Sequence, residues 1–186
     1  MVLTTLSNFS GLCPTAACSC LPESADLLLD AAKQAEFLAV CWDTLPEPEI
    51  LHDLSGLSSR LLVPESWQSL LPQAGLLVSS SISGGDLRQR FQTLADRRCC
   101  WLVPERLCRQ FPLPCPDGQG FPLSEIPRDS GFYSEALGCR YVHRPQNVIL
   151  FDTEETLEYK IHLAQECGFL GVFSTETLNL VQTGSP

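Results

Sequence analysis

Apolar runs the length of a β-strand recur along the whole chain, and they constrain its fold more than any other feature. The runs lie at residues 37–42, 60–63, 75–79, 99–103, 139–143, 148–151 and 170–173. Most of them are apolar without interruption, which is typical of parallel strands buried on both faces. Because parallel strands need long crossover connections, we expect helices in the segments between the runs.

Helix patterns do lie between several of these runs. Residues 24–35 begin with Ser24, which suits the N-cap position, and residues 85–95 place their apolar side chains on one face. Residues 153–166 begin with an acidic first turn, which the helix dipole favours. This alternation of strands and helices predicts an α/β fold with a mainly parallel sheet.

A short repeat, Leu-Val-Pro-Glu, occurs twice and ends at Glu65 and at Glu105. Each copy closes an apolar run and opens a polar stretch. Proline at the first helical position loses no intrahelical hydrogen bond, and a glutamate beside it faces the positive end of the helix. We therefore expect a helix to begin near each of these glutamates.

The length of 186 residues suits one domain with a full core better than two domains. We predict a single domain over residues 1–186. Within it, residues 1–22 form a cysteine-containing segment that we expect to be poorly ordered. Residues 110–131 are rich in proline and glycine and are expected to form a long surface loop.

The net charge of −10 disfavours a nucleic-acid partner, because binding phosphates needs clustered Lys and Arg. No apolar run approaches the length of about 18 residues needed to cross a bilayer, and the N-terminus has no secretory signal pattern. We expect a cytoplasmic protein without a membrane partner, whose ten cysteines are reduced. No cofactor is predicted, and a carbohydrate or protein ligand is left open.

The closing segment of the chain carries a family resemblance. A strand over residues 147–152 ends in an aspartate, the next helix bears a hydroxyl residue and a lysine, and glycines bound a returning strand. The matching positions are Asp152, Thr156, Lys160, Gly168 and Gly171. This segment resembles the final strand–helix–strand unit of the chitinase-like glycoside hydrolases (family eighteen). The turn at Ser83, Gly84 and Gly85 resembles the Ser-x-Gly-Gly turn after an earlier strand of the same barrel.

The chain also departs from that family. Its catalytic pattern, Asp-x-x-Asp-x-Asp-x-Glu, does not occur in this sequence, and the returning strand at residues 170–173 has no tryptophan. An eight-unit barrel usually needs about 200 residues or more. The resemblance therefore implies a shortened or incomplete (β/α) barrel, similar to a TIM barrel, and carries no catalytic residue over. The alternative architecture is an open parallel sheet of flavodoxin-like type.

Carboxylates that follow apolar runs are the first candidate site. In parallel α/β folds ligands collect at the carboxyl ends of strands. Asp43, Glu105 and Asp152 lie there and are candidates for catalytic acids, and Glu65 and Glu176 follow runs as well. The alternative is that these side chains stabilise helix N-termini, with Asp152 capping the helix after it. We assign no catalytic residue from the sequence.

Two further patterns are candidate sites. Ser83, Gly84 and Gly85 precede a predicted helix and could bind an anion through free backbone N–H groups, although Asp86 beside them would repel it. A plain strand-to-helix turn is the alternative.

Cys13, Cys18 and Cys20, with Cys41, could supply thiolates to zinc or an iron–sulfur cluster, but their spacing is not a usual one for either. The alternative is that they are small buried residues without a metal.

Three functions fit these patterns. We favour a non-catalytic, degenerate glycoside-hydrolase-like barrel that binds a carbohydrate or a protein. The second is a hydrolase whose acids have moved to other strand ends, and the third is a phosphate- or nucleotide-binding module that uses the Ser/Gly turn. Convergence of Asp43, Glu105 and Asp152 on one pocket would favour the hydrolase. A pocket lined by Trp42, Trp67 or Trp101 would favour sugar binding.

Overall fold

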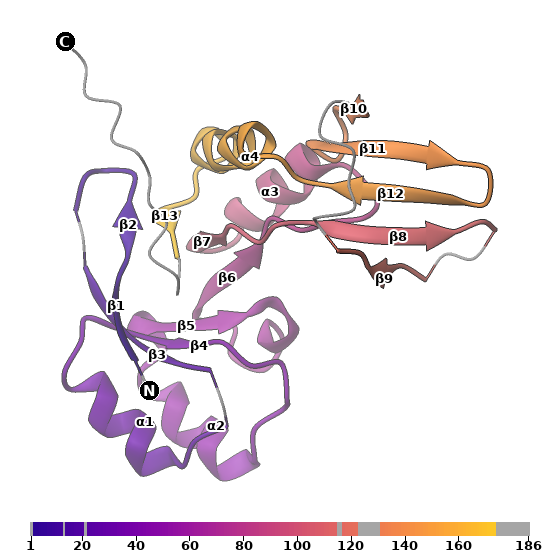
Figure 1. Ribbon diagram of the computed structural model, residues 1–186. Helices are drawn as coiled ribbons and strands as arrows, with labels where there is room; N and C mark the ends of the chain where they lie inside the picture. The colour runs from indigo at the N-terminus through magenta and orange to yellow at the C-terminus, as the bar shows by residue number, and fades with distance from the viewer. Residues whose placement is uncertain (1, 13, 21, 115–116, 123–130, 174–186) are drawn as a thin grey trace.

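The computed structural model describes residues 2–12, 14–20, 22–114, 117–122 and 131–173, and it contains two sheets and four α-helices (Figure 1). The larger sheet has eight strands in the order β1-β3-β4-β5-β6-β7-β13-β2. Their bounds are β1 Val2–Thr5, β2 Ser7–Asn8, β3 Thr15–Ser19, β4 Phe37–Val40, β5 Leu61–Pro64, β6 Gly75–Ser79, β7 Cys100–Val103 and β13 Gly171–Val172. Six of these strands are parallel to one another, as predicted: β3, β4, β5, β6, β7 and β13. The strands β1 and β2 pair antiparallel at the two ends of the sheet.

The larger sheet curls because its two end strands are parts of one chain segment. Only Leu6 separates β1, which pairs with β3, from β2, which pairs with β13. The N-terminal segment therefore contacts both the first and the last parallel strand (Figure 1). This confirms the shortened, incomplete (β/α) barrel. The open flavodoxin-like sheet is wrong, because an open sheet ends in two separate edge strands.

The N-terminal segment contributes the strands β1, β2 and β3 in its described part, and the poor order that we expect over residues 1–22 stays a prediction. Its strands β1 and β3 pair over four residue positions, from Val2 opposite Cys18 to Thr5 opposite Thr15. Leu6 is fully buried and belongs to the same core cluster as Ala16 and Phe173. These backbone hydrogen bonds satisfy groups that would otherwise be exposed at the edges of β3 and β13.

The smaller sheet is antiparallel and has the order β10-β11-β12-β8-β9. Its strands are β8 Cys108–Pro112, β9 Gln119–Gly120, β10 Phe132–Ser134, β11 Cys139–Arg144 and β12 Asn147–Phe151. The prediction that the runs at 139–143 and 148–151 join the parallel sheet is wrong. Only two residues connect β11 to β12, and so short a connection permits an antiparallel hairpin alone. The end of β8 and all of β9 lie within 110–131, where we expected a loop.

The helices α1 (Ala25–Ala32), α3 (Leu87–Ala95) and α4 (Glu154–Glu166) lie where the sequence predicts them. The helix α2 (Pro48–Ser55) was not predicted, although Pro48 in its first turn is a typical start signal. Glu65 opens a short 3₁₀ helix, Glu65–Trp67. The prediction of a helix after Glu105 is wrong, because the chain turns there and Leu107 enters the core before β8.

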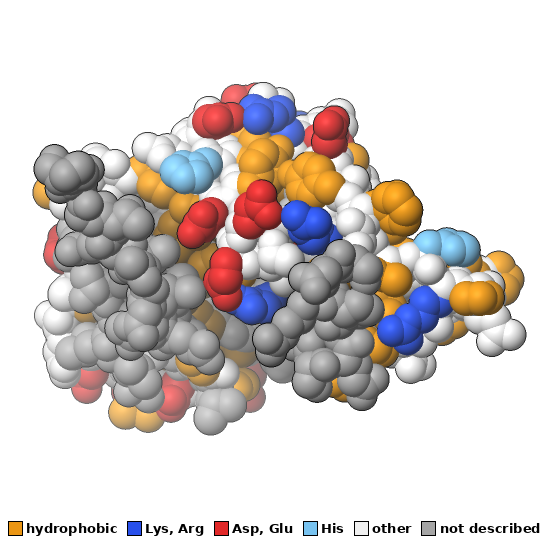
Figure 2. All heavy atoms as spheres, turned by 45° about the horizontal axis from the view of Figure 1, so that its top comes forward, with side chains coloured by type: hydrophobic (Ala, Val, Ile, Leu, Met, Phe, Trp, Pro, Cys, Tyr) orange, Lys and Arg blue, Asp and Glu red, His pale blue; other side chains and the backbone are white. Residues whose placement is uncertain are grey.

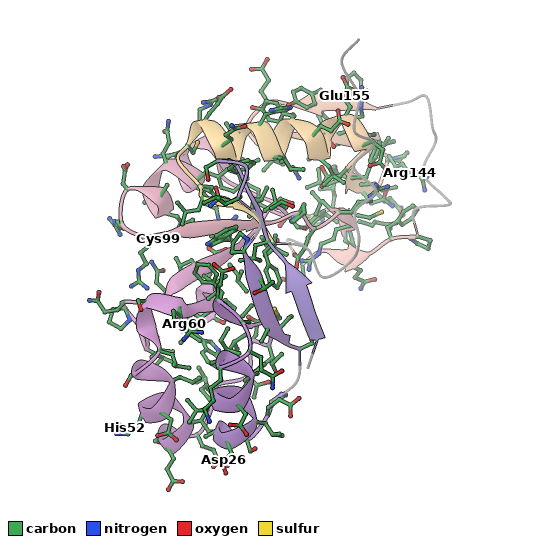
Figure 3. The ribbon with its side chains drawn as sticks, turned by 90° about the vertical axis from the view of Figure 1, so that its left-hand side faces the viewer. Asp26, His52, Arg60, Cys99, Arg144 and Glu155 are labelled. Atoms are coloured by element: carbon green, nitrogen blue, oxygen red, sulfur yellow. The ribbon has the colours of Figure 1, made fainter. Side chains whose placement is uncertain are left out.

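Arg60 fixes the end of α1 against the rest of the barrel. Its guanidinium donates to the backbone carbonyls of Ala32, Ala35 and Glu36, the last at 3.0 Å from Nε. These carbonyls lie at and after the C-terminus of α1, where helix geometry leaves them without intrahelical partners (Figure 3). A cation at this position also suits the negative end of the helix dipole.

Side chains of the parallel strands alternate between two cores. One core lies inside the curled sheet and contains Leu6, Ala16, Cys18, Ala39, Leu62, Leu77, Trp101 and Phe173. The intervening residues, such as Leu38, Val63 and Leu76, pack with side chains of the helices on the outer face. Because alternate residues point to opposite faces, the inner set continues at the carboxyl ends of the strands into the side chains that line a pocket there.

A buried ion pair connects the smaller sheet to α4. Asp152 follows β12 and accepts hydrogen bonds from Lys160 Nζ at 2.8 Å, Thr156 Oγ1 at 3.0 Å and the Leu107 backbone N–H at 2.8 Å. Both charged side chains are fully buried. The prediction that Asp152 caps the helix is wrong, because Thr153 is the N-cap and forms a capping box with Thr156.

The outer surface of α4 carries exposed charged side chains. Ion pairs join it to neighbouring segments, among them Arg88–Glu166 and Arg140–Glu155. Figure 2 shows acidic and basic side chains next to one another on this face. Exposed pairs of this kind contribute little to stability. None of the helices in the described ranges is long and apolar enough to cross a membrane.

We predict that Lys160→Met lowers the free energy of unfolding by about 3–5 kcal/mol, because it leaves the Asp152 carboxylate buried without its cation. Asp152→Asn in the same chain removes that charge and restores part of the loss. Urea denaturation measures both effects. Arg88→Met, which breaks an exposed pair, is the control and changes stability by less than about 1 kcal/mol. A similar small change for Lys160→Met would contradict the prediction.

We predict that Gly171→Ala weakens the contact between β13 and β2. A Cβ atom on Gly171 would lie 2.2 Å from the Ser7 carbonyl oxygen and 2.7 Å from the Asn8 Cα, so the strands must separate. The expected loss is about 1–3 kcal/mol by urea denaturation. Gly84→Ala is the matched control, since its Cβ would meet nothing within 4 Å. Equal stability of the two variants would show that this contact does not hold the curl.

Candidate functional site

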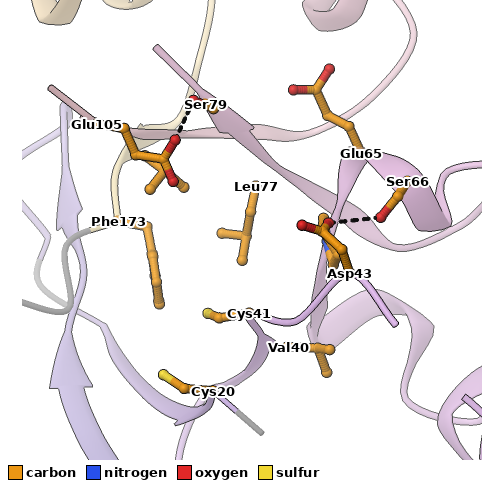
Figure 4. Close-up of a pocket in the computed structure, with 12 residues that line it drawn as sticks. Cys20, Val40, Cys41, Asp43, Glu65, Ser66, Leu77, Ser79, Glu105 and Phe173 are labelled. Atoms are coloured by element: carbon orange, nitrogen blue, oxygen red, sulfur yellow. Dashed lines mark hydrogen bonds between the residues drawn. The ribbon is translucent and has the colours of Figure 1, made fainter. Parts of the chain in front are cut away.

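A pocket opens at the carboxyl ends of the parallel strands, and its volume is about 410 Å³ (Figure 4). Its apolar wall is formed by Val40, Leu77, Val103 and Phe173, and its polar side chains are Cys20, Cys41, Asp43, Glu65, Ser66, Ser79 and Glu105. These residues come from or follow β3, β4, β5, β6, β7 and β13. The pocket therefore depends on the curl that brings β13 round toward β3.

The period of the strands explains which side chains reach the pocket. On β6, Leu77 faces the interior of the curled sheet, and Ser79 lies two residues later on the same side. On β7, Trp101 faces the interior, and Val103 and Glu105 lie two and four residues later. On β4 the same alternation runs from Ala39 through Cys41 to Asp43. The acids thus occupy the inner positions just beyond the strands.

Serine hydroxyls hold two of the pocket carboxylates. Ser79 Oγ donates to Glu105 Oε2 at 2.6 Å, and Ser66 Oγ donates to Asp43 Oδ1 at 2.9 Å (Figure 4). The third carboxylate, Glu65, forms an ion pair with Arg90. In the part of the chain that the structure describes, Asp43 and Glu105 have no ion-pair partner. Both can therefore accept further hydrogen bonds from a ligand.

The backbone of Glu105 is held in addition to its side chain. Ser80 Oγ donates to the Glu105 carbonyl at 3.0 Å and accepts from the Glu105 N–H at the same distance. Ser80 itself is fully buried. This pair of hydrogen bonds fixes the turn that presents the carboxylate to the pocket.

The structure brings two of the three candidate acids together. Asp43 and Glu105 line the same pocket, and Glu65 lies with them. Asp152 lies elsewhere, because its strand β12 belongs to the smaller sheet and its carboxylate is buried against Lys160. Its environment makes it a structural residue.

The tryptophans do not line this pocket. Trp42, Trp67 and Trp101 are buried, and Trp42 packs edge-on against Trp67 with ring centroids 5.6 Å apart. Among the described lining residues the aromatic side chain is Phe173. The tryptophan lining that would favour sugar binding is therefore not found among the described residues of this pocket, and its apolar wall is mostly aliphatic.

The turn at Ser83, Gly84 and Gly85 is exposed and precedes α3. Asp86 is the N-cap of that helix, and its Oδ1 accepts from the Gln89 N–H at 2.8 Å. A carboxylate thus lies where an anionic ligand would meet the helix N-terminus. Ligand binding at this turn stays a prediction.

Three thiols meet beside the pocket. Cys18 Sγ lies 3.4 Å from Cys41 Sγ and 3.6 Å from Cys20 Sγ. The hydrogen bond with Cys41, together with burial, raises the pKa of Cys18 far above its usual value, and burial also raises the pKa of Cys20. Cys13 lies outside the described residues. Within them no group of three or more His, Cys, Asp or Glu has the arrangement of a metal site.

Several pocket residues escaped the sequence analysis. Cys41, Ser66, Ser79 and Phe173 were not chosen as pocket residues, although the period-two alternation of each strand could have marked Cys41 and Ser79 as inner positions. Ser66 could not be found this way, because it lies in the 3₁₀ turn after β5. Its contact with Asp43 depends on how β4 and β5 are paired.

Comparison with known proteins gives a likeness of fold. No protein-family model matches the chain, and no curated protein sequence matches it. Among solved structures, it is similar to a glycoside hydrolase family 18 N-acetylglucosaminidase from Paenibacillus barengoltzii, with a TM-score of 0.52 and 12% identity over 82% of this chain and 69% of that one. A class V chitinase from Nicotiana tobaccum, a mutant solved in complex with NAG4, gives a TM-score of 0.39 and 11% identity over 84% and 69%. The fold of this chain is therefore similar to that of a glycoside hydrolase family 18 barrel.

Proposed function

We propose that this chain is a cytoplasmic, non-catalytic barrel of glycoside-hydrolase-like fold that binds a carbohydrate in the pocket at the carboxyl ends of its strands. The observation that carries this proposal is the composition of that pocket. The carboxylates of Asp43 and Glu105 line it together with an apolar wall that includes Leu77 and Phe173.

A sugar has the surface that such a pocket complements. One face of the ring carries C–H groups that pack on apolar side chains, and the hydroxyl groups at its edge donate hydrogen bonds. Carboxylates are strong acceptors for these donors. The pocket volume of about 410 Å³ also falls in the usual range of small-molecule sites, about 300–1,000 Å³.

The ligand class follows from the same chemistry and from the similar structure. An N-acetylated sugar offers an amide N–H in addition to its hydroxyls, and its methyl group suits an aliphatic wall. The similar bacterial structure is an N-acetylglucosaminidase. We therefore propose sugars that contain N-acetylglucosamine as the ligands.

The absence of catalysis is supported by the sequence and by the contacts of the acids. The pattern Asp-x-x-Asp-x-Asp-x-Glu does not occur in the chain. Cleavage of a glycosidic bond needs a protonated acid beside a nucleophile. Asp43 and Glu105 are exposed and already act as hydrogen-bond acceptors for serine hydroxyls.

One observation favours the second candidate, a hydrolase with relocated acids. Asp43 and Glu105 reach the same pocket from β4 and β7, as such an enzyme requires. The two candidates differ in whether the bound sugar is released intact or cleaved. Binding and cleavage are therefore measured separately.

We predict that the protein binds N-acetylglucosamine or its β-linked disaccharide through these carboxylates. Asp43→Ala and Glu105→Ala should each weaken binding by about ten-fold or more, because a hydrogen bond to a charged group is worth about 1.5–3 kcal/mol. Calorimetric titration measures the dissociation constants. Glu158→Ala, which removes an exposed carboxylate from α4, is the control and leaves binding unchanged. Equal affinity in all four proteins would place the ligand elsewhere.

We also predict that a chromogenic N-acetylglucosaminide is not hydrolysed faster with the protein than in buffer. Glu105→Ala and Asp43→Ala should show the same background rate, which absorbance at the leaving group's wavelength records. A rate above background in the unaltered protein that is lost in either variant would replace the binding module with the hydrolase.

A further inference from the structure

The three thiols beside the pocket form a chemical group of their own. Cys20 is exposed, Cys41 is half-buried, and both line the pocket (Figure 4). Cys18 is buried and contacts both, at 3.4 Å from Cys41 Sγ and 3.6 Å from Cys20 Sγ. The proposed sugar site uses none of these sulfur atoms.

The pairing of β3 and β4 brings the thiols together. The register places Ser19 opposite Val40, and the Cys41 N–H donates to the Ser19 carbonyl at 2.9 Å. Cys20 and Cys41 are the next residues after this last pair, just beyond the ends of β3 and β4. Neighbouring strands lie about 4.7–4.9 Å apart, which falls within the Cα separation of about 4.4–6.8 Å that a disulfide needs.

Cys18 is placed to assist its neighbours. It lies on β3, two residues before Cys20, which follows the strand, and the two sulfur atoms lie 3.6 Å apart on the same side. The hydrogen bond with Cys41 and burial keep Cys18 protonated, because they raise its pKa. Its S–H can therefore donate to Cys41 Sγ when that sulfur carries the negative charge.

We propose that Cys20 and Cys41 form a thiol–disulfide exchange site at the mouth of the pocket, with Cys18 as the positioning residue. The oxidant is a low-molecular-weight disulfide, RSSR. The exchange needs no metal ion, since thiolate and disulfide supply all the electrons that move.

The reaction has two steps, each an attack of a thiolate on a disulfide sulfur. Cys41 Sγ attacks RSSR, the S–S bond breaks, and one RS⁻ leaves and takes the proton that Cys41 lost. Cys20 Sγ then attacks Cys41 Sγ in the mixed disulfide and expels the second RS⁻, which takes the proton from Cys20. The sum is one RSSR reduced to two RSH and two thiols oxidised to the Cys20–Cys41 disulfide.

The unaltered protein provides the first test. It is incubated with oxidised glutathione, the remaining thiols are blocked by alkylation, and tryptic peptides are compared with and without reduction by mass spectrometry. Cleavage after Lys33 and Arg60 gives the peptides 1–33 and 34–60, and the second contains Cys41 as its sole cysteine. The expected product is these two peptides joined, with fragmentation placing the bond at Cys20. A join at Cys13 or Cys18, or no join while other cysteines are modified, overturns the proposal.

Variants test the separate roles. Cys20→Ser should stop the reaction after the first step and leave glutathione attached to Cys41. Cys18→Ala should still give the Cys20–Cys41 bond but about ten-fold more slowly, and Cys18→Ser, which keeps a donor, should recover part of that rate. Cys167→Ser, which alters a thiol on the far end of α4, is the control with an unchanged rate. An unchanged rate in Cys18→Ala removes the positioning role, and a disulfide in Cys20→Ser that still joins the two peptides overturns the site.

Discussion

The N-terminal strand segment is the constraint on which the rest of the structure depends. It pairs with β3 through Val2–Thr5 and with β13 through Ser7–Asn8, so it closes the space between the first and last parallel strands. Cys20 follows β3 and Phe173 follows β13, and both line the pocket. If this segment paired with only one of the two strands, β3 and β13 would not be held together, and Cys20 and Phe173 would not line the same pocket. Gly171 is the position where the closure is tightest.

A second constraint joins the smaller sheet to the barrel. Asp152 binds Lys160 and Thr156 on α4 and the Leu107 N–H on the connection between β7 and β8. One carboxylate therefore links three segments. A buried ion pair stabilises little in net terms, because desolvation offsets much of the attraction, but each partner is costly to remove alone. Such a pair favours one arrangement of the two sheets over others.

The sequence predicts the parallel strands because they are buried on both faces and hence apolar throughout, as in residues 75–79 and 99–103. It predicts Asp43 and Glu105 as rim residues for the same reason, since the carboxyl ends of parallel strands meet. It fails for Asp152, because the apolar run before it pairs antiparallel with β11 and never joins that rim. The sheet that a strand joins is decided by pairing between distant segments, and local periodicity in the sequence does not predict that pairing.

Strand pairing also explains two further features that the sequence alone does not predict. The short strand β2 has two residues and no apolar run of its own, so its role as a closing strand follows only from its partners. The sequence analysis groups Cys41 with Cys18 and Cys20, but their contact depends on the register of β3 against β4, which the spacing of cysteines along the chain does not contain. That spacing indicates neighbours along one segment, whereas the sulfur nearest to Cys18 belongs to Cys41, which follows β4.

The double hydrogen bond between Ser80 and the Glu105 backbone has a consequence for the thermodynamics of recognition. A ligand that meets a mobile carboxylate must immobilise it, and the lost conformational freedom reduces affinity. Here the turn is already fixed by a buried serine, and the carboxylate by Ser79. The conformational entropy of this part of the pocket is lost when the chain folds, so ligand binding does not have to reduce it again. Under the proposed function, a small ligand with few contacts would therefore still bind, and a molecule of the wrong shape would meet a surface that does not adapt to it.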